Sequence, residues 1–415
     1  MRKQDTTRFF AIPEHEVRRI HFLDEEGTPT GCDAKVSEVI VELTRTTKRF
    51  CCQCGRVFKR YYDVQERLVR DLPWGPWSKV YLLVPRFRVA CPDCGVTAEP
   101  LEWIPRRYRH TRRFVEAVAL ACREVRCIDA IAQAFGVSWD TVKAIDKAAL
   151  EAELNPPDLG RVRHLALDEF SIKRRHTYGT IFLDLERNRV LWVCSTREKK
   201  AVIDVFRNVF GKEVCEGIEA VSMDWWRAYE EAVKECLPNA VVVWDLFHVV
   251  KKYNLEVIDR VRLDEARRCQ SDDDRKAMKK TKFLLLKNRS NLRGEEPAKL
   301  KTLLAANRRL LVVYVLRDAL KELWQYRYPR CAHKWFQGWY HRAIRSRIEP
   351  LKRFARVLKE RLHGILAHCR HRIHTGTLEG INNKVKVIKR IAYGYRDQDY
   401  FFLKIRAHFT GIHPH

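Results

Sequence analysis

Three acidic residues have the type and position to act on phosphodiester bonds. Asp168 ends the run Val-Arg-His-Leu-Ala-Leu-Asp and Asp224 ends the run Ala-Val-Ser-Met-Asp, whereas Glu379 comes much later in the chain. Chemistry at phosphorus requires an activated nucleophile and a stabilised leaving oxygen, and two Mg²⁺ ions about 3.5–4 Å apart provide both. Carboxylates are the hard oxygen ligands that Mg²⁺ prefers. In this scheme Asp168 bridges both ions, Asp224 and Glu379 each bind one, and Mn²⁺ can substitute for Mg²⁺.

Asp245 is the main competitor of Asp224 for the metal. It follows a short apolar run at 240–244 and precedes His248 by three residues. We favour Asp224 because it ends the fourth expected strand, whereas Asp245 and His248 could hydrogen-bond to each other and orient the site. The choice between the two acids stays open at this point.

Two tryptophans, Trp225 and Trp226, follow Asp224 directly. Exposed aromatic rings beside a cleavage site could stack on a displaced base. Core packing is the favoured interpretation for both, because a tryptophan side chain buries a large apolar area.

The elements that must position the acids follow from the apolar patterning. Three strands, a helix, a strand, a helix and a strand follow one another along the chain. This is the element order of a ribonuclease H-like α/β fold, in which acids at strand ends converge across a mixed sheet. The expected elements are strands at 162–168, 178–185, 190–194 and 240–244, a strand ending at 224, and a helix at 199–210.

A helix is expected to carry Glu379. Apolar residues repeat every three or four positions from 378 to 388, and Thr377 would cap this helix, which places Glu379 in its first turn. Its polar side includes Lys386 and Arg390, which could hold the scissile strand by its phosphates. Residues 251–373, which precede this helix, are basic and helical in composition, so an all-helical insertion is expected there.

Two pairs of cysteines in the first hundred residues have metal-ligand spacing. The first pair is Cys51-x-x-Cys54-Gly and the second is Cys91-x-x-Cys94-Gly. Each pair forms a tight turn, or knuckle, and two knuckles can offer four thiolates to one tetrahedral Zn²⁺. A turn at 72–76 between apolar runs fits a zinc ribbon with a long hairpin. Cys52 leaves open which thiol binds. A site closed by four cysteines is structural, because no coordination position remains for a substrate.

The spacing of residues 114–150 predicts a helix-turn-helix. Ile131 and Phe135 share one apolar face, Gly136 supplies a turn, and Ser138 is the expected N-cap of the next helix. An ordinary helical hairpin would give the same pattern, and the basic stretch before it, residues 105–113, is equally well explained as a solvated linker. The adjacent cysteine pairs and basic stretch favour DNA binding. The residues expected to contact DNA here are Arg106, Arg107, Arg109, Arg112, Arg113, Lys143 and Lys147.

The charge of the chain indicates a polyanionic partner. Among 415 residues, 80 are Lys or Arg and 53 are Asp or Glu, which gives a formal net charge of +27. Nucleic acid is favoured over a membrane surface, because no amphipathic anchor, lipidation motif or long apolar segment is evident. The absence of an export signal favours a reducing cytoplasm, with the protein on the nucleoid when it is bound to DNA.

Five sequence blocks, taken together and in order, resemble one known family. They are the paired Cys-x-x-Cys-Gly units, Leu-Ala-Leu-Asp168-Glu-Phe, Ser-Met-Asp224-Trp-Trp-Arg-Ala-Tyr, Trp-Asp245-Leu-Phe-His248-Val-Val-Lys, and Glu379-Gly-Ile-Asn-Asn-Lys-Val-Lys-Val-Ile-Lys-Arg390-Ile-Ala-Tyr-Gly-Tyr. Over nearly the whole chain these blocks resemble bacterial insertion-sequence transposases of the DDE type, most of all the L-three insertion-sequence family. The resemblance implies that Asp168, Asp224 and Glu379 are the catalytic triad, and that Asp245 and His248 correspond to a D-x-x-H element that follows the second acid.

The resemblance also implies an architecture and an activity. A zinc ribbon and a helix-turn-helix precede an α/β ribonuclease H-like catalytic core that is interrupted by the all-helical insertion. The protein is expected to bind the terminal inverted repeats of its element as a homodimer or larger assembly on double-stranded DNA, to cleave DNA, and to join 3′ hydroxyl ends to target DNA by two-metal phosphoryl transfer. The expected parts are a zinc ribbon domain at 1–105, a helix-turn-helix domain at 106–155, the first part of the core at 160–250, the insertion at 251–373 and the final part of the core at 374–415.

Two other functions remain open from the sequence. A catalytically silent or domesticated transposase would use the N-terminal domains as a DNA-binding regulator, although the presence of all three acids argues against a decayed site. A structure-specific nuclease would cut DNA without joining it. Products of strand transfer separate these alternatives from a transposase.

Overall fold

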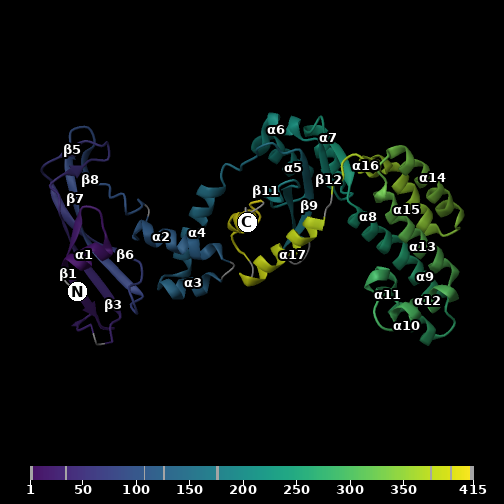
Figure 1. Ribbon diagram of the computed structural model, residues 1–415, viewed down its shortest axis with the longest axis horizontal. Coiled ribbons are helices and arrows are strands. Elements are labelled where there is room, and N and C mark those ends of the chain that lie inside the picture. Colours follow the sequence, from purple (N-terminus) through teal and green to yellow (C-terminus); the bar gives the residue numbers. More distant parts are fainter. Residues whose placement is uncertain are drawn as a thin grey trace. The chain divides into compact units, whose positions relative to one another are not determined.

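The structure, a computed structural model, describes residues 3–32, 35–106, 108–124, 127–173, 177–373, 376–392 and 395–411 (Figure 1). The side chains of residues 3–6, 173, 376, 377 and 379 are outside this description. The chain forms two compact units. One consists of Met1–Glu153 with Ile388–Arg396, and the other of Leu154–Val387 with Asp397–His415.

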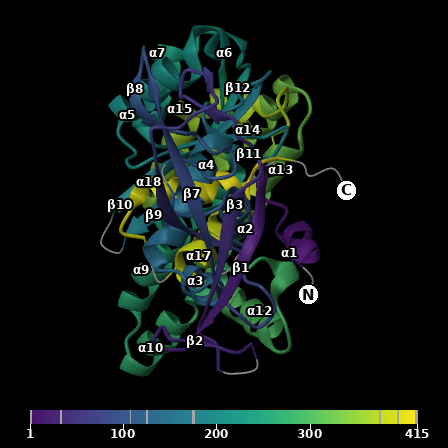
Figure 2. The ribbon, with the colours of Figure 1, turned by 90° about the vertical axis from the view of Figure 1, so that its left-hand side faces the viewer.

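The first unit contains a six-stranded sheet, whose long strands face the viewer in Figure 2. Its order is β2-β1-β3-β7-β6, with β8 paired to β7, and only the β3–β7 pairing is parallel. The turn predicted at 72–76 joins β6 to β7 in an antiparallel hairpin, which confirms that prediction. The strands are β1 (His15–Leu23), β2 (Pro29–Thr30), β3 (Glu38–Arg45), β6 (Asp63–Asp71), β7 (Lys79–Cys91) and β8 (Gly95–Ala98), and helix α1 (Lys3–Phe10) precedes them.

Three helices follow this sheet: α2 (Arg112–Arg123), α3 (Ile128–Phe135) and α4 (Trp139–Leu154). Gly136 ends α3 with φ +60°, a left-handed conformation that glycine adopts without a steric penalty. The hydroxyl of Ser138 accepts a hydrogen bond from the backbone N–H of Thr141 at 3.2 Å, as expected of an N-cap. Buried apolar residues from all three helices form one core, so the predicted helix pair and its turn are confirmed.

The second unit is built on a five-stranded mixed sheet of order β11-β10-β9-β12-β13. The first three strands in the chain pair antiparallel, and β12 and β13 run parallel to β9. The predicted order of strands and helices is confirmed. The strands are β9 (His164–Lys173), β10 (Thr177–Asp184), β11 (Arg189–Cys194), β12 (Ala220–Met223) and β13 (Val241–Trp244), with α5 (Lys199–Val205), the π-helical turn η1 (Phe206–Phe210) and α6 (Gly211–Gly217) before β12 and α7 (Arg227–Cys236) after it.

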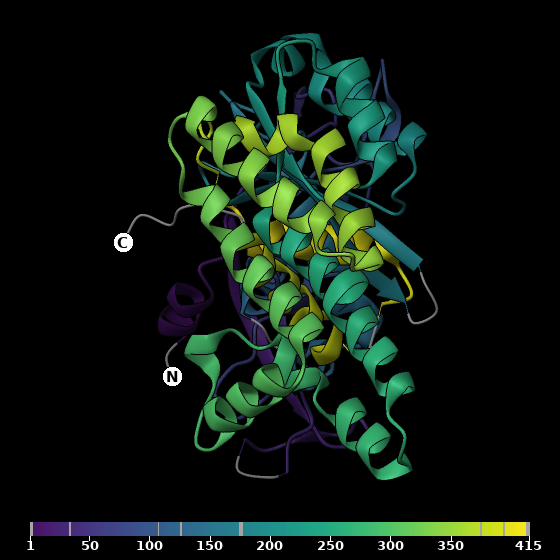
Figure 3. The same ribbon diagram turned by 90° about the vertical axis from the view of Figure 1, so that its right-hand side faces the viewer.

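From residue 246 to residue 367 every regular element is a helix, as predicted for most of this segment. Figure 3 shows these helices, in green, packed alongside one another. They are α8 (Leu246–Tyr253), η2 (Asn254–Asp259), α9 (Arg260–Arg268), α10 (Asp272–Lys280), α11 (Lys282–Leu286), η3 (Arg289–Asn291), α12 (Glu296–Ala306), α13 (Arg308–Glu322), η4 (Leu323–Gln325), α14 (Pro329–Arg345), α15 (Glu349–Glu360) and α16 (Leu362–Ala367).

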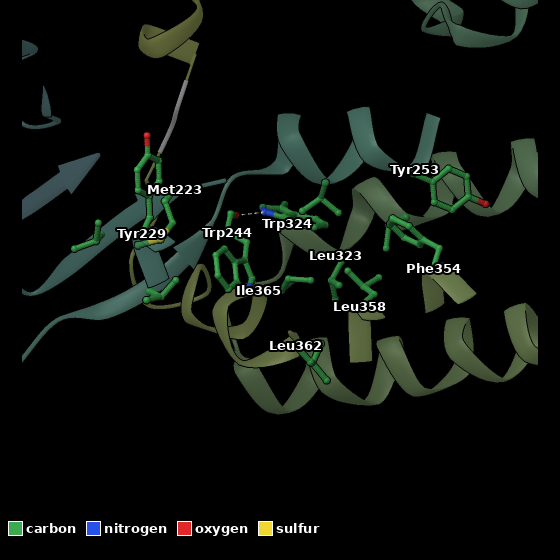
Figure 4. Packing of buried hydrophobic residues seen from close by; sticks show 14 of the residues in the cluster. Met223, Tyr229, Trp244, Tyr253, Leu323, Trp324, Phe354, Leu358, Leu362 and Ile365 are labelled. Carbon is green, nitrogen blue, oxygen red and sulfur yellow. Dashed lines mark hydrogen bonds between the residues drawn. The ribbon is translucent and has the colours of Figure 1, made fainter. Parts of the chain in front are cut away.

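One continuous hydrophobic core joins this helical segment to the sheet. Trp244, the last residue of β13, is fully buried, and its backbone carbonyl accepts a hydrogen bond from the indole N–H of Trp324 at 3.3 Å (Figure 4). A Cβ atom at Gly364 would lie 2.4 Å from Nε1 of Trp244, so α16 can approach the strand only with glycine there. The helices therefore hold the end of β13, where Asp245 begins the next segment.

Two helices complete the chain, α17 (Gly376–Ile391) and α18 (Gln398–His408). α18 packs against β11, and the backbone N–H of Val190 donates to the carbonyl of Phe409 at 2.9 Å. In α17 the predicted apolar stripe is buried, and the side chains of Lys386 and Arg390 are exposed on its polar side. Within the described ranges, no helix is long and apolar enough to cross a membrane.

Candidate active site and cysteine cluster

The register of the second sheet places three acids in one row. Leu167 of β9 lies beside Met223 of β12, which lies beside Trp244 of β13. The next residue in each segment is an aspartate: Asp168 lies within β9, whereas Asp224 and Asp245 directly follow β12 and β13. The predicted strand end at Asp168 is therefore wrong, because β9 continues to Lys173 in its pairing with β10. Since β12 and β13 are parallel to β9 and in register with it, the three aspartates lie side by side at the carboxyl ends of β12 and β13. The structure therefore brings the two predicted acids together and sets their competitor directly beside them.

Each aspartate of the row accepts a hydrogen bond from a nearby backbone N–H. The donors are Glu169 to Asp168 at 2.9 Å, Trp226 to Asp224 at 3.0 Å, and Phe247 to Asp245 at 2.9 Å. The last bond makes Asp245 the N-cap of α8. A capping role gives Asp245 a structural reason to be present, which supports Asp224 as the second acid of the row.

His248 lies between two acids of the row. Its Nε2 atom is 3.8 Å from Oδ1 of Asp168 and 3.6 Å from Oδ2 of Asp245. These distances fit ion pairs of a protonated imidazole, and they are longer than a direct hydrogen bond. The contact between Asp245 and His248 is thus longer than the predicted hydrogen bond and is an ion pair only when the imidazole is protonated. Asp168 lies at a similar distance from His248, which the spacing of the D-x-x-H element did not indicate.

Helix α17 contributes Asn382 to the same site. Its side-chain N–H₂ donates to Oδ2 of Asp168 at 2.7 Å, and its Oδ1 atom is buried with no hydrogen-bond partner in the described part of the chain. The sequence placed Asn382 on the polar side of the helix without identifying this contact. The signal that could have indicated it is the spacing from Glu379, since residues three apart on a helix share a face. Glu379 itself lies in α17, one turn before Asn382, and its side chain is outside the described residues.

Burial makes two acids of the row, Asp168 and Asp224, hold protons more tightly. Asp168 is 4% exposed, and loss of solvent raises its pKa to about 6, although His248 and the hydrogen bond from Asn382 oppose the shift. Burial also raises the pKa of Asp224, and the charge of Glu169 adds to this increase. Buried carboxylates with raised pKa values gain stability from a nearby cation. Oxygen donors in this arrangement suit a hard divalent ion such as Mg²⁺.

The raised pKa of Asp168 predicts that Asp168→Asn stabilises the protein in the absence of divalent metal. An increase from 3.8 to about 6 means that ionised Asp168 costs the folded state about 3 kcal/mol above pH 6. This cost disappears as the pH falls below 4, where the carboxyl is protonated in both states. In EDTA at pH 7.5 we therefore expect the free energy of unfolding of the variant to rise by about 1–3 kcal/mol.

Urea denaturation at pH 7.5 and pH 5 measures this effect. The advantage of Asp168→Asn is expected to shrink at pH 5, and the exposed Asp204→Asn, in α5 of the same unit, should show no gain at either pH. An equal or lower stability of Asp168→Asn at pH 7.5 would contradict the prediction.

Four thiols gather in the first unit, and one of them differs from the predicted set. The sulfur atoms of Cys52, Cys54, Cys91 and Cys94 lie within 4.8 Å of one another. Cys51, which the sequence spacing favoured, is outside this group and is replaced by Cys52. Cys51 ends the short strand β4 (Phe50–Cys51), which pairs with β5 (Val57–Phe58). Successive side chains on a strand point in opposite directions. Cys52, in the turn after β4, therefore directs its sulfur toward the β7–β8 turn, and Cys51 does not.

Two thiols of the cluster, Cys52 and Cys94, have pKa values shifted in opposite directions. A hydrogen bond with the hydroxyl of Thr97 lowers the pKa of Cys52 to about 6. Hydrogen bonds with Cys52 and Cys54 raise the pKa of Cys94 to about 12. Four sulfurs at this spacing fit the tetrahedral thiolate set of a structural zinc site.

Residues 165–405, more than half of the chain, match a family model described as a transposase of the DDE type, and residues 99–150 match the helix-turn-helix domain of transposase family ISL3. The chain belongs to the ISL3 family of transposases. It is a DDE transposase, and it acts in DNA transposition.

Relatives of this ISL3 transposase match over most of their length. The transposase of insertion sequence element IS1001 from Bordetella parapertussis is 43% identical over 374 residues, which cover 89% of this chain and 91% of that protein. The transposase of element IS1557 from Mycobacterium tuberculosis is 27% identical over 404 residues, which cover 91% of this chain and 89% of that protein. A solved strand transfer complex of the Drosophila P element transposase aligns with a TM-score of 0.39 and 10% identity, over 71% of this chain and 90% of that chain, a likeness too low to assign a fold.

The helix-turn-helix domain of the ISL3 transposase presents an aromatic residue with a cation beside it. Trp139, at the start of α4, is 46% exposed, and Nζ of Lys143 lies 5.7 Å from the centre of its ring. Arg106, Arg109 and Arg112 of the basic stretch are exposed, and Arg107 lies outside the described residues. These three arginines are therefore at the surface, as the predicted DNA contacts require, whereas Lys143 and Lys147 are half-buried.

Arg113 differs from Arg112, whose exposed guanidinium donates to the backbone carbonyl of Glu102, because Arg113 bonds a buried carboxylate. Its guanidinium pairs with the buried carboxylate of Asp71 and donates to the carbonyl of Phe10 at 2.7 Å. Thr111 donates to the same carboxylate at 2.7 Å. These bonds connect the sheet to the start of α2, so we assign Arg113 a structural role.

The two tryptophans beside Asp224 have different environments in the transposase. Trp225 is half-buried and stacks on Phe354, with ring centres 6.0 Å apart, which agrees with the core-packing interpretation. Trp226 is 38% exposed, and the guanidinium of Arg197 lies 4.2 Å from its ring centre. Core packing is therefore wrong for Trp226. Arg197 also pairs with Glu169 at 2.6 Å, an arrangement of distant residues that the sequence did not indicate.

Proposed function

We propose that this transposase cleaves the ends of its element and joins the resulting 3′ hydroxyl groups to target DNA at one acid cluster. The observation that carries the proposal is the row of Asp168, Asp224 and Asp245 at the carboxyl ends of β12 and β13, with Asn382 of α17 bonded to Asp168. Cleavage and joining are both phosphoryl transfers, so a single cluster can serve both steps.

The catalytic part is proposed to be a ribonuclease H-like core, formed by residues 160–250 and 374–415 and interrupted by a helical insertion at 251–373. The sheet order, with three antiparallel strands followed by two strands parallel to the first, supports this assignment. Residues 1–105 and 106–155 are proposed to be a zinc ribbon domain and a helix-turn-helix domain that recognise the terminal repeats.

Asp168, Asp224 and Glu379 are the proposed metal-binding triad. Two bound Mg²⁺ or Mn²⁺ ions would activate the attacking oxygen and stabilise the leaving oxygen. Asn382 holds one oxygen of Asp168 by its side-chain N–H₂, which fixes the carboxylate, while His248 and Asp245 lie on its other side. Glu379 is proposed as the third acid because it lies one turn before Asn382 on α17, and Asn382 contacts Asp168.

The proposed DNA contacts serve two purposes: some bind the phosphates of the scissile strand, and others recognise the element ends. Lys386 and Arg390 are exposed on α17 and would hold the scissile strand by its phosphates. The contacts proposed for the N-terminal region are Arg106, Arg107, Arg109, Arg112, Lys143 and Lys147.

One structural Zn²⁺ is proposed at the cysteine cluster. The active form is proposed to be a homodimer or larger assembly on DNA.

Cleavage and strand transfer on labelled DNA that carries the element ends test this proposal. In Mg²⁺ the wild type is expected to nick the ends and to give products joined to target DNA, and the exposed variant Asp204→Asn should behave in the same way. Cleavage without joined products would assign the protein as a nuclease. Specific binding without cleavage would assign it as a regulator.

A further inference from the structure

Two cavities, of about 270 Å³ and about 360 Å³, open on the sheet of the first unit and share one wall. Arg67 of β6 and Arg86 of β7 line both of them. In the β6–β7 hairpin Arg67 lies opposite Val84, and Arg86 lies opposite Gln65. Residues two apart on a strand share a face, so both arginines are on the face that carries Val84. Val84 is buried in the core of this sheet, and the arginines therefore lie where that core ends.

The segment that covers the two arginines leads into the helix-turn-helix. It consists of residues 98–109, several of which line the cavities. The guanidinium of Arg67 donates to the carbonyl of Tyr108 at 3.3 Å, and the backbone N–H of Arg70 donates to the carbonyl of Arg109 at 2.8 Å. The chain then enters α2, which contacts β6 (Figure 1). Because the matched helix-turn-helix domain begins at residue 99, the cavities lie where this domain meets the sheet.

Arginines outnumber carboxylates around the two cavities. Both cavities together are lined by four arginines and two glutamates, which are Arg67, Arg86, Arg106, Arg109, Glu66 and Glu99. Glu99 is buried and pairs at 2.8 Å with Arg45, which lies outside the lining. Two positive charges thus remain in excess in the lining, even when both glutamates are ionised.

The arginines that face the cavities lack a counter-charge in the free protein. Burial and the charges of Arg86 and Arg109 lower the pKa of Arg67. In the part of the chain that the structure describes, no carboxylate lies within ion-pair distance of these three side chains. Arg88, two residues further along β7, differs because it donates to Asp63 at 2.6 Å. An anion bound among unpaired guanidinium groups supplies both the missing charge and the missing acceptors.

We propose that Arg67, Arg86 and Arg109 bind one phosphate of the DNA backbone, next to the stretch of duplex that the helix-turn-helix contacts. The inference rests on the proposed function, because it needs the first unit bound to the element ends. DNA is favoured over a free anion because Arg106 and Arg109 are exposed on the segment that leads into α2. A phosphate contact of this kind fixes the position of the protein on the duplex and carries no sequence information.

Element-end duplexes with single neutral phosphates test the proposal. Each duplex carries one methylphosphonate, at successive positions along both strands, and its affinity for the zinc-loaded full chain is measured without Mg²⁺. Arg86→Gln is expected to weaken binding of the unmodified duplex at least about tenfold, as loss of a charged hydrogen bond does. The slope of log affinity against log salt should become shallower by about one. At the bound phosphate alone, the methylphosphonate should weaken the wild type and leave Arg86→Gln unchanged.

Three variants separate this contact from general charge and from misfolding. Arg19→Gln is the matched control, because it removes an exposed arginine of β1 in the same sheet, outside both cavities. It should respond to every methylphosphonate like the wild type. Arg86→Gln should not lower the Tm of the free protein, because it relieves repulsion with Arg67. If it does lower the Tm, Arg109→Gln carries the same test, since the side chain of Arg109 is exposed.

The outcomes distinguish this inference from the proposed function. If the arginine variant and the wild type lose the same factor at every position, the inference is wrong and DNA cleavage is unaffected by that result. Calorimetry with inorganic phosphate and no DNA adds a second arm: binding to the wild type alone, with no coupled position, would assign a free-anion site and overturn the inference. If one position is coupled but the wild type neither cuts nor joins DNA in Mg²⁺, the phosphate site stands and the proposed chemistry fails. If the wild type does not bind the ends, both are overturned.

Discussion

Asp168→Asn is expected to lower the rates of DNA cleavage and joining in Mg²⁺ by at least about a thousandfold, with little change in DNA affinity. Asp168 is the acid that accepts a hydrogen bond from Asn382 and faces His248, so it lies where the sheet and α17 meet. Loss of a metal-binding carboxylate removes several kcal/mol of transition-state stabilisation, and each 1.4 kcal/mol corresponds to a factor of ten. Gel assays on labelled element ends give the rates, and binding in EDTA gives the affinity.

Matched variants decide the remaining roles in the site. Asp224→Asn and Glu379→Gln should lose as much activity as Asp168→Asn, whereas Asp245→Asn should keep much more, since asparagine also caps a helix. The gain in stability expected for Asp168→Asn excludes unfolding as the cause of its inactivity. If Asp245→Asn is inactive while Asp224→Asn is active, Asp245 is the second metal-binding acid. An active Glu379→Gln would remove that residue from the triad.

Cys52→Ser is expected to abolish zinc binding and to unfold the domain around the cysteine cluster. Structural zinc sites contribute apparent free energies of about 10–16 kcal/mol to folding, and three thiolates bind the ion far more weakly than four. The purified wild type should carry about one zinc per chain, and the variant less than about a tenth of that. Plasma emission spectrometry measures the metal, and limited proteolysis reports on the fold of the domain.

Cys51→Ser is the matched control, because it removes the neighbouring thiol, which lies outside the cluster. It should keep its zinc, its resistance to proteolysis and its affinity for the element ends. If zinc is lost from Cys51→Ser and kept by Cys52→Ser, the ligand set inferred from the Cys-x-x-Cys spacing is right and the arrangement of thiols described above is wrong.

Features that depend on neighbouring residues could be predicted from the sequence. Apolar runs of alternating or helical period indicated the order of strands and helices in the second sheet, and Gly136 with Ser138 indicated the turn between α3 and α4. Asp224 was placed at a strand end because an apolar run stops there, which is confirmed, whereas β9 continues past Asp168 to Lys173 because its pairing with β10 extends further than the apolar run. In each confirmed case the physical cause, the side-chain period or the cap, acts over a few residues and is visible in the sequence.

Features that depend on distant residues came only from the packed chain. Asn382 contacts Asp168 across 214 residues, and nothing in the local pattern of either selects the other. The same is true of Arg197, whose guanidinium lies over the ring of Trp226. The spacing of polar residues predicts a face of a helix, whereas packing decides what that face meets.

By itself, the sequence determined which residues of this transposase could carry out chemistry on DNA and the order of the elements that bear them. The tertiary structure decided which of these residues meet. It put Cys52 in the cluster in place of Cys51, because a one-residue step along a strand reverses the direction of a side chain. It also turned Arg113 inward to Asp71, because a buried carboxylate is stable only when it is paired. Spacing along a chain does not specify direction in space, and direction is set when the elements pack.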